Sequence, residues 1–356
     1  MSLETLLRSG RILFEQKYLQ GSKQLFHTLF KMEDADTSAT VLLDEFIDEP
    51  IAVAYRDKNN QAHLREYIPG SGTLYEPPIA DEQTPVDEVL RDESVEGMES
   101  TAGFNAAQMR KTDKILNTHS TDHNMRKNKQ AIDMYREGVF YAPGIGGNDI
   151  GKNEPFTRDV GNDLTADFSA VTIDDALAAG NDQLTDHDCS QDNRFCIMGK
   201  SWQKEWENDT NVQNRMQANT ANVLVMQNMN PPEWMGTQGL KWLGEYRPAG
   251  SSVGINMFSY NPGVKYTAYK GATATPWIPD DEMIMGSFDS PSYRIYRGID
   301  VVNETVSKII RTVGELVFDT YISASPVAEF FRSHTRHLFL MGNINHTLRS
   351  TGSNFN

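Results

Sequence analysis

Leu25-Phe26-His27-Thr28-Leu29-Phe30 opens the stretch of sequence that decides the fold, and this stretch ends at Pro77-Pro78. Between these ends the chain reads VLLDEF at 41–46, EPIAVAYRD at 49–57 and YIPG at 67–70. An apolar pair is followed by a strand, an acidic hairpin with a polar tip, and a proline-rich return. The stretch has too few apolar positions to fold alone and no catalytic pattern. We therefore expect a flap that lies on a neighbouring subunit.

The order of apolar and proline residues in this stretch resembles the front of the lambda-type major capsid protein of tailed phages. That family begins with an apolar F-x-x-x-F anchor, reaches a Pro-Ile element at a long hairpin, and returns through a Pro-Gly…Pro stretch. The matching residues are Phe26 and Phe30, Pro50 and Ile51, Pro69 and Gly70, and Pro77 and Pro78. Residues 276–286 (PWIPDDEMIMG) resemble a later strand of the family, and residues 325–331 with 338–341 resemble its closing strands.

The resemblance implies an α+β chain with the Hong Kong 97-type phage capsid fold. The parts it implies are an N-terminal arm (1–45), an extended E-loop hairpin (46–80), a peripheral domain (81–164) with a long spine helix (104–139), an axial domain (165–300), and a return to the peripheral-domain sheet (301–356). The chain departs from the family pattern in a larger insertion around 205–250 and in residues 299–318, which match poorly.

The same resemblance implies a structural virion protein and not an enzyme. Its copies would form pentamers and hexamers that build an icosahedral head shell around packaged double-stranded DNA, held non-specifically. The implied partners are the chain itself, scaffold and portal proteins and a decoration protein, with assembly in the host cytoplasm and no cofactor, metal or membrane. The assembly contacts that we predict are Phe26, Phe30, Pro50, Ile51, Tyr55, Tyr67, Pro69, Arg126, Lys127 and Lys129.

Composition agrees with a globular chain of 356 residues, long enough for two subdomains. No apolar run reaches the roughly 18 residues that a membrane span requires. Met1-Ser2-Leu3-Glu4 lacks the basic region and apolar core that begin a signal peptide. Cys189 and Cys196 fit no zinc spacing, and a cytosolic site of synthesis predicts two reduced thiols.

The net charge of −16 disfavours tight wrapping of nucleic acid, because phosphate neutralisation requires clustered Lys and Arg. The charge is also uneven. Residues 33–100 hold 18 Asp or Glu against 4 Lys or Arg, whereas residues 108–136 hold 7 Lys or Arg against 3 Asp or Glu. Two interpretations stay open. These are solvated faces, or the acidic flap of one subunit crosses the basic segment of its neighbour.

Local patterns predict the main elements. Residues 104–139 contain no proline and carry a thin apolar stripe, which predicts a long polar helix that ends at Gly138. Further on, residues 173–180 and 201–218 predict helices, and residues 195–199, 253–260 and 277–285 predict strands. Residues 302–317 fit a helix slightly better than a strand, and residues 316–348 are expected to return as strands beside the long helix.

Three patterns suggest chemistry and were weighed against simpler interpretations. Gly146-x-x-x-x-Gly151-Lys152 lacks the Ser or Thr of a phosphate-binding loop, so a glycine-rich surface loop is favoured. His119 and His123 have the spacing of a metal-binding pair on a helix, but a third ligand is not identifiable. The carboxylates at 186–188 and 280–282 lack calcium-loop spacing, so solvated turns are favoured. The alternatives to a capsid are a metal-dependent hydrolase that uses the two histidines, and a phage tail subunit.

Overall fold

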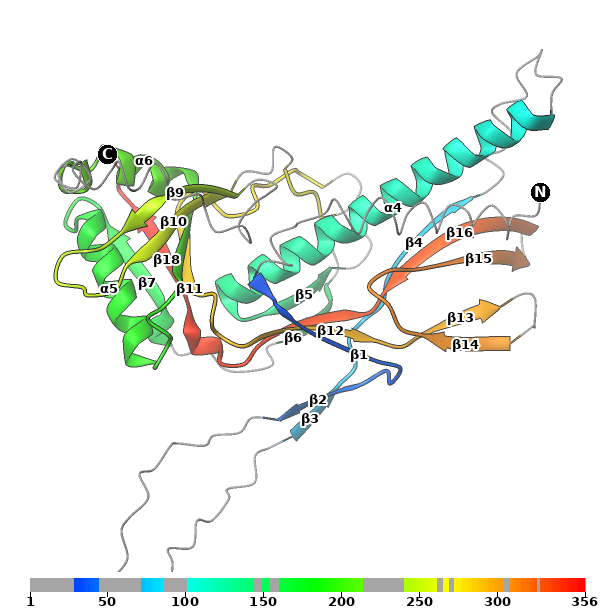
Figure 1. Cartoon of the computed structure of the whole chain (residues 1–356), viewed down its shortest axis with the longest axis horizontal. Coiled ribbons are helices and arrows are strands. Elements are labelled where there is room, and N and C mark those ends of the chain that lie inside the picture. The colour runs from blue at the N-terminus through cyan, green and yellow to red at the C-terminus, as the bar shows by residue number, and fades with distance from the viewer. Residues whose placement is uncertain are drawn as a thin grey trace, which may run out of the picture.

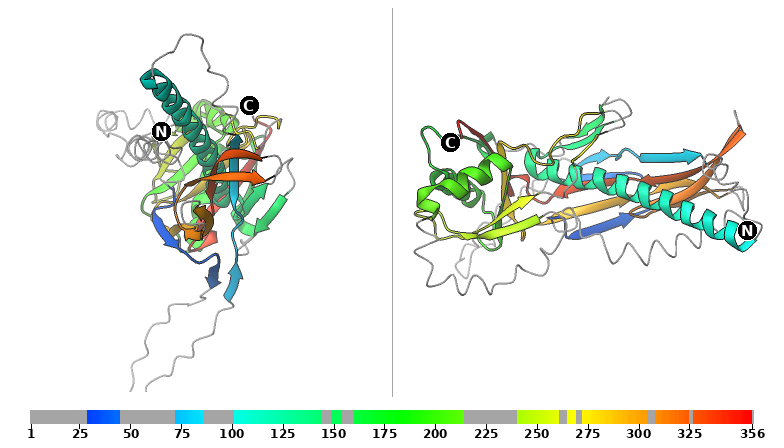
Figure 2. Two further views of the ribbon diagram at one scale, coloured as in Figure 1. Left: turned by 90° about the vertical axis from the view of Figure 1, so that its right-hand side faces the viewer. Right: turned by 90° about the horizontal axis from the view of Figure 1, so that it is seen from above.

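The computed structural model describes residues 29–44, 72–85, 101–143, 149–153, 160–213, 240–260, 265–268, 272–303, 308–324 and 327–355. They form an elongated body in which one long helix, α4 (Thr101–Glu137), runs between two groups of strands (Figure 1). A six-stranded sheet with helices α5 (Ile173–Asp186) and α6 (Lys200–Asn208) lies at one end, and smaller sheets lie along the other (Figure 2). Among the described residues, no helix is both long enough and apolar enough to cross a membrane.

The large sheet combines strands from distant parts of the sequence. Its order is β7 (Asp163–Asp167), β18 (Thr347–Ser353), β11 (Glu282–Ser287), β8 (Arg194–Met198), β10 (Ile255–Tyr260) and β9 (Leu240–Tyr246). The β7–β18 and β8–β10 pairs are parallel, and the other pairs are antiparallel. Two short 3-10 turns, Val160–Asn162 and Ile344–His346, lead into β7 and β18.

The smaller sheets lie along α4 and beyond it. One has the order β1 (Met32–Asp36), β12 (Ser292–Arg297) and β17 (His337–Met341), and another has the order β15 (Val317–Ala324), β16 (Val327–Thr335) and β4 (Ala80–Pro85). Three strand pairs complete the set: β2 (Val41–Asp44) with β3 (Gly72–Tyr75), β5 (Phe140–Pro143) with β6 (Asp149–Asn153), and β13 (Ile299–Asn303) with β14 (Lys308–Thr312).

The core has two parts because both faces of the large sheet are covered. Side chains alternate along a strand, so Phe195 and Ile197 of β8 join the cluster that contains α4, whereas Cys196 and Met198 join the cluster that contains α5 and α6. All five residues of β8 are buried. Strands with both faces covered read as continuous apolar runs, which is why this strand was visible in the sequence.

The long helix agrees with the sequence prediction for residues 104–139. It ends where expected, because Gly138 takes the left-handed conformation (φ 71°) and donates its N–H to the carbonyl of Met134 at 2.9 Å. The cysteines also agree with prediction, since both Cys189 and Cys196 are free thiols.

Several local predictions were wrong. Helix α5 continues past Gly180 to Asp186, because Gly180 faces Met285 of the sheet and does not end the helix. The predicted helix over 201–218 is interrupted at Asp209, since α6 ends at Asn208 and residues 210–213 form a further helical stretch, while residues 214–218 lie outside the described residues. Residues 299–303 and 308–312 pair as the antiparallel strands β13 and β14 and do not form a helix. Within residues 301–356, β18 lies in the large sheet, whereas β17 pairs with β12 in a smaller sheet; the domain division itself stays a prediction.

Candidate assembly surfaces

The two predicted metal-ligand histidines, His119 and His123, lie on the buried face of α4 and are 1% and 5% exposed. Ser333 of β16 lies between them, with its Oγ 2.9 Å from Nδ1 of His119 and 3.0 Å from Nε2 of His123. The other ring nitrogen of His119 is 2.8 Å from the Thr84 hydroxyl. Hydroxyls therefore engage both rings, and no metal-binding group of three or more His, Cys, Asp or Glu side chains occurs among the described residues.

Burial sets the charge of this histidine pair. It lowers the pKa of His119, and together with the nearby Lys127 ammonium it lowers the pKa of His123 to about 3. Both rings are therefore neutral at pH 7, and each can donate one hydrogen bond and accept another. The cluster holds α4 against β16 and β4 through hydrogen bonds and carries no charge of its own.

His334 and His337, on β16 and β17, are also buried. Nε2 of His334 lies 2.9 Å from Oδ1 of Asp319, and this carboxylate also accepts two hydrogen bonds from Arg332. Interaction with Asp319 raises the pKa of His334 against the opposing effect of burial. His337 pairs with Gln130 of α4. Three histidines, His119, His123 and His337, thus lie at the contact between α4 and the strands, whereas His334 bonds to its neighbours within the sheet.

The basic residues predicted to contact a neighbour make contacts within their own subunit. Lys127 is 1% exposed, and its Nζ lies 2.9 Å from Oε1 of Glu315. Arg126 donates to the hydroxyl of Tyr266 and to the carbonyl of Ala268 at 3.0 and 2.6 Å. Lys129 pairs with Asp133 at 2.7 Å, one helical turn away. Each of the three cations therefore has a partner in its own chain, and their contact with a neighbouring subunit stays a prediction.

Phe30, which was predicted as an anchor that contacts another subunit, packs within its own chain. Its ring is fully buried in its own chain, with its centroid 5.2 Å from that of Tyr135 and 4.9 Å from that of Phe339. The Leu29 carbonyl accepts hydrogen bonds from Tyr135 and Ser292, which fixes the backbone beside this ring. The other predicted contacts lie outside the described residues and stay predictions: Phe26, Pro50, Ile51, Tyr55, Tyr67 and Pro69.

Two further sequence patterns have structural explanations. Gly151, Lys152 and Asn153 belong to β6, and a phosphate-binding loop would require a helix at this point. Glu282 is not in a solvated turn. It is buried in β11, where both of its carboxylate oxygens accept hydrogen bonds from the Arg136 guanidinium of α4. This bidentate pair joins the long helix to the large sheet.

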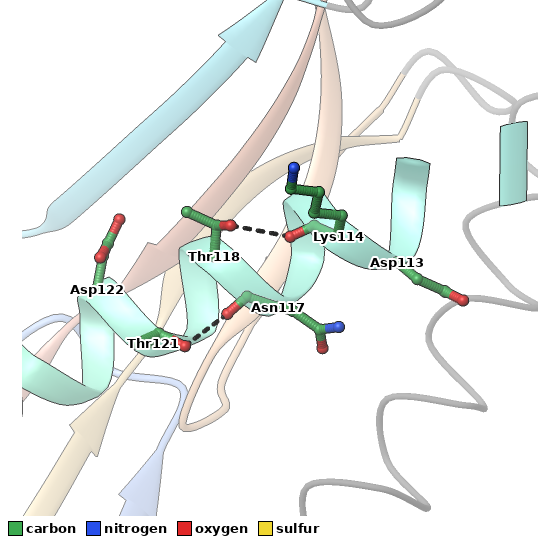
Figure 3. A pocket seen from close by; sticks show the side chains of 6 residues that line it. All are labelled: Asp113, Lys114, Asn117, Thr118, Thr121 and Asp122. Atoms are coloured by element: carbon green, nitrogen blue, oxygen red, sulfur yellow. Dashed lines mark hydrogen bonds between the residues drawn. The ribbon is translucent and has the colours of Figure 1, made fainter. Parts of the chain in front are cut away.

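A shallow recess of about 430 Å³ lies on the face of α4 that points away from His119 and His123 (Figure 3). Its described lining comes from this one helix: Asp113, Lys114, Asn117, Thr118, Thr121 and Asp122. The hydroxyls of Thr118 and Thr121 donate to helix carbonyls at 2.9 and 2.8 Å, so they are already used within the helix. These side chains do not converge from different elements, and the recess has no arrangement typical of catalysis.

A larger cavity of about 1250 Å³ lies between α6, β9, β10 and residues 276–280. Four lysines line it, and they are Lys200, Lys204, Lys241 and Lys265. All four are exposed, whereas the neighbouring Trp277 is buried. This site could not be recognised from the sequence, because its lysines come from separate elements that the fold brings together.

Comparison with known proteins places this geometry in a known fold. No protein-family model matches the chain, and no curated protein matches its sequence. A crystal structure described as the candidate capsid protein of a prophage of E. coli CFT073 superposes with a TM-score of 0.60 at 14% identity, covering 97% of this chain and 99% of that chain. This chain has the fold of that prophage protein.

The capsid fold predicted from the sequence is therefore confirmed. Two more distant structures are a phage-related protein from Bordetella bronchiseptica RB50 and the capsid of Ralstonia phage GP4. The first has a TM-score of 0.47 at 10% identity, with 96% of each chain covered. The second has a TM-score of 0.45 at 12% identity, with 94% of this chain and 92% of that chain covered.

Within this capsid fold, the base of the predicted E-loop is formed by β2 and β3. These strands pair in antiparallel register from Val41 opposite Tyr75 to Asp44 opposite Gly72. They extend away from the body below β1 (Figure 1). The hairpin predicted further out, at residues 53–67, lies outside the described residues.

Proposed function

We propose that this chain is a major capsid protein, the repeating subunit of a phage-type head shell. The observation that carries this function is a fold match that extends over 97% of the chain, to a protein itself described as a candidate capsid protein. A match over nearly the whole length leaves little room for a separate catalytic domain. Fold alone does not fix function, so the strands that lie at the surface of the subunit supply the second argument.

The strand pairs β2–β3 and β13–β14 support an assembling subunit. Each is a two-stranded sheet that is not joined to a larger sheet among the described residues. An isolated two-stranded hairpin is marginally stable in water, and an open strand edge offers unpaired N–H and C=O groups. Contact with another copy would stabilise both pairs. Such contacts are expected in a shell and have no role in a monomeric enzyme.

We further propose that the contacts are head-to-tail and close into rings of five and six subunits. Interfaces between two different surfaces of the same chain form rings when the rotation closes. Rings joined into an icosahedral shell would enclose double-stranded DNA, in the virion, after assembly with scaffold and portal proteins in the host cytoplasm. The net charge of −16 suits a container wall, because an acidic surface does not hold packaged DNA tightly.

Negative-stain microscopy tests this function. The chain is expressed alone and together with a candidate scaffold protein, and the purified particles are imaged. Closed shells of uniform diameter are the expected result. Tubes would instead indicate a tail subunit. Featureless monomers under both conditions, at concentrations up to those of an infected cell, would refute the proposal.

A further inference from the structure

The lysine-lined cavity is the basic surface that the sequence led us to seek on α4. Lys200 and Lys204 lie in the first two turns of α6, Lys241 lies in β9, and Lys265 precedes a short bridge between Tyr266 and Thr275. The only carboxylates among the described lining residues are those of Glu207 and Asp280. The net charge of the whole chain is −16, whereas this cavity is lined by four lysines and two carboxylates. Its local positive charge favours an acidic partner.

Apolar side chains between the lysines define the chemistry of that partner more closely. Trp277 and Ile278 are buried at 6% and 5% exposure, while Tyr260 and Leu240 are half-buried and also line the cavity. A surface with an apolar floor and a cationic rim matches a polypeptide in which carboxylates alternate with apolar residues. A phosphate chain would use the lysines but would gain nothing from the aromatic and aliphatic floor.

One segment of this chain has that composition. Residues 86–100, VDEVLRDESVEGMES, contain six Asp or Glu, one Arg, and apolar residues at Val86, Val89, Leu90, Val95 and Met98. Residues 45–71, which include most of the predicted E-loop (46–80), contain five Asp or Glu against three Lys or Arg and are nearly twice as long. Of the segments outside the described residues, 86–100 therefore has the greatest negative charge per residue, and its apolar residues match the cavity floor.

Chain length shows that this segment must come from another copy. The segment begins after Pro85, next to Thr84, which lies opposite His119 on α4, and it ends at Thr101. The cavity begins at Tyr260 and Trp277, which contact Asn128 and Lys129. At 1.5 Å per helical residue, a path from the level of His119 to that of Asn128 and back to Thr101 takes about 54 Å along the helix axis.

Sixteen Cα–Cα steps from Pro85 to Thr101 span at most about 58 Å when fully extended. That length leaves almost nothing for the sideways distance from α4 out to the lysines of α6 and back. A segment bound in the cavity must also place several residues there. The connection of one subunit therefore cannot fill its own cavity, whereas the connection of a neighbouring subunit has no such restriction.

We propose that the lysine-lined cavity of one subunit binds the acidic segment 86–100 of a neighbouring copy of this chain. The contact rests on the proposed function, since it assumes that two copies meet in one assembly. It joins two different surfaces of the same chain, which is the head-to-tail arrangement that produces rings. It also replaces Arg126, Lys127 and Lys129 as the basic partner of the acidic region, because those three cations are paired within their own subunit.

Charge reversal on both sides tests the contact. Lys200→Glu with Lys241→Glu reverses the cavity, Asp92→Lys with Glu93→Lys reverses the segment, and a fourth chain carries all four changes. We expect each double variant to lower the yield of shells at least tenfold and the fourfold variant to restore it. Lys31→Glu with Lys114→Glu, two exposed lysines outside the cavity, is the matched control and should assemble as wild type does. Failure of the fourfold variant to restore assembly would overturn the contact.

Direct binding separates this contact from the shell function. A fluorescent peptide of residues 86–100 is titrated with the unassembled full-length subunit, and its anisotropy is followed. We expect saturable binding that weakens at least tenfold for Lys200→Glu with Lys241→Glu, and that weakens as salt rises from 0.05 to 0.5 M. Binding without shells would refute the capsid function and keep the contact. Shells without peptide binding would refute the contact alone, as would tighter binding of duplex DNA or of a peptide of residues 45–59.

Discussion

Replacing Phe30 with alanine should strongly destabilise the isolated subunit. The ring is fully buried and makes an edge contact with Tyr135 at 5.2 Å and a tilted contact with Phe339 at 4.9 Å. Phe→Ala in a packed core costs about 3–5 kcal/mol, of which each aromatic pair contributes about 0.5–1.5 kcal/mol. With an m-value of about 3 kcal/mol per M of urea, the unfolding midpoint should fall by roughly 1–1.7 M.

Urea titration monitored by tryptophan fluorescence measures this change, at a subunit concentration below that needed for assembly. Tyr293→Ala is the matched control, because Tyr293 lies in β12 of the neighbouring sheet but is 37% exposed. Its midpoint should move by no more than the equivalent of about 0.5 kcal/mol. Suppose Phe30→Ala leaves the midpoint unchanged and blocks assembly. The ring would then fill a pocket of another subunit, as the sequence suggested, and the packing described here would be wrong.

Three further changes test other parts of the fold. Arg194→Ala should lower the free energy of unfolding by at least about 3 kcal/mol, because this fully buried side chain donates to the carbonyls of Asn181, Ser190 and Cys189. Equal unfolding midpoints for the variant and the wild type in guanidinium chloride would contradict this. Burial lowers the pKa of His123 to about 3 in the folded state, so the unfolded chain binds a proton first as the pH drops below 6.5, and the free energy of unfolding declines toward pH 3. His123→Gln should flatten that decline in melting curves recorded between pH 7 and 4. An unaltered slope would exclude this histidine as a cause. Gly199→Ala should reduce the yield of folded protein, because a Cβ there would lie 2.2 Å from the Pro279 carbonyl, whereas Gly314→Ala, with its nearest contact at 3.5 Å, should be tolerated.

Local composition was enough to predict the elements whose pattern depends only on neighbouring residues in the sequence. The α4 helix followed from a long run without proline that ends at a glycine, and β8 followed from the apolar run at residues 195–198. Both patterns depend on neighbours in sequence. The β13–β14 pair was missed because its valines and isoleucines, Val301-Val302 and Ile309-Ile310, belong to a pattern that fits helical spacing slightly better than strand spacing.

The chemistry of the α4 interface could not be predicted, because its partners are distant in sequence. Lys127 resembles any exposed helical lysine until Glu315 is placed 2.9 Å from its Nζ. His119 and His123 have the spacing of metal ligands, and only the position of Ser333 shows that both rings are instead hydrogen-bonded to its hydroxyl. Helical spacing places side chains on one face, but it does not show what covers that face.

The late position of β18 in the sequence affects when the large sheet can form during translation. This strand lies between β7 and β11 in the large sheet, yet it is synthesised about 180 residues after the first and 60 after the second. During translation β7 therefore has no partner strand among the described residues, and β11 has one open edge. The large sheet closes only when residues 347–353 emerge from the ribosome. Such non-local closure is slow, so the last strand to be synthesised sets when this sheet is complete.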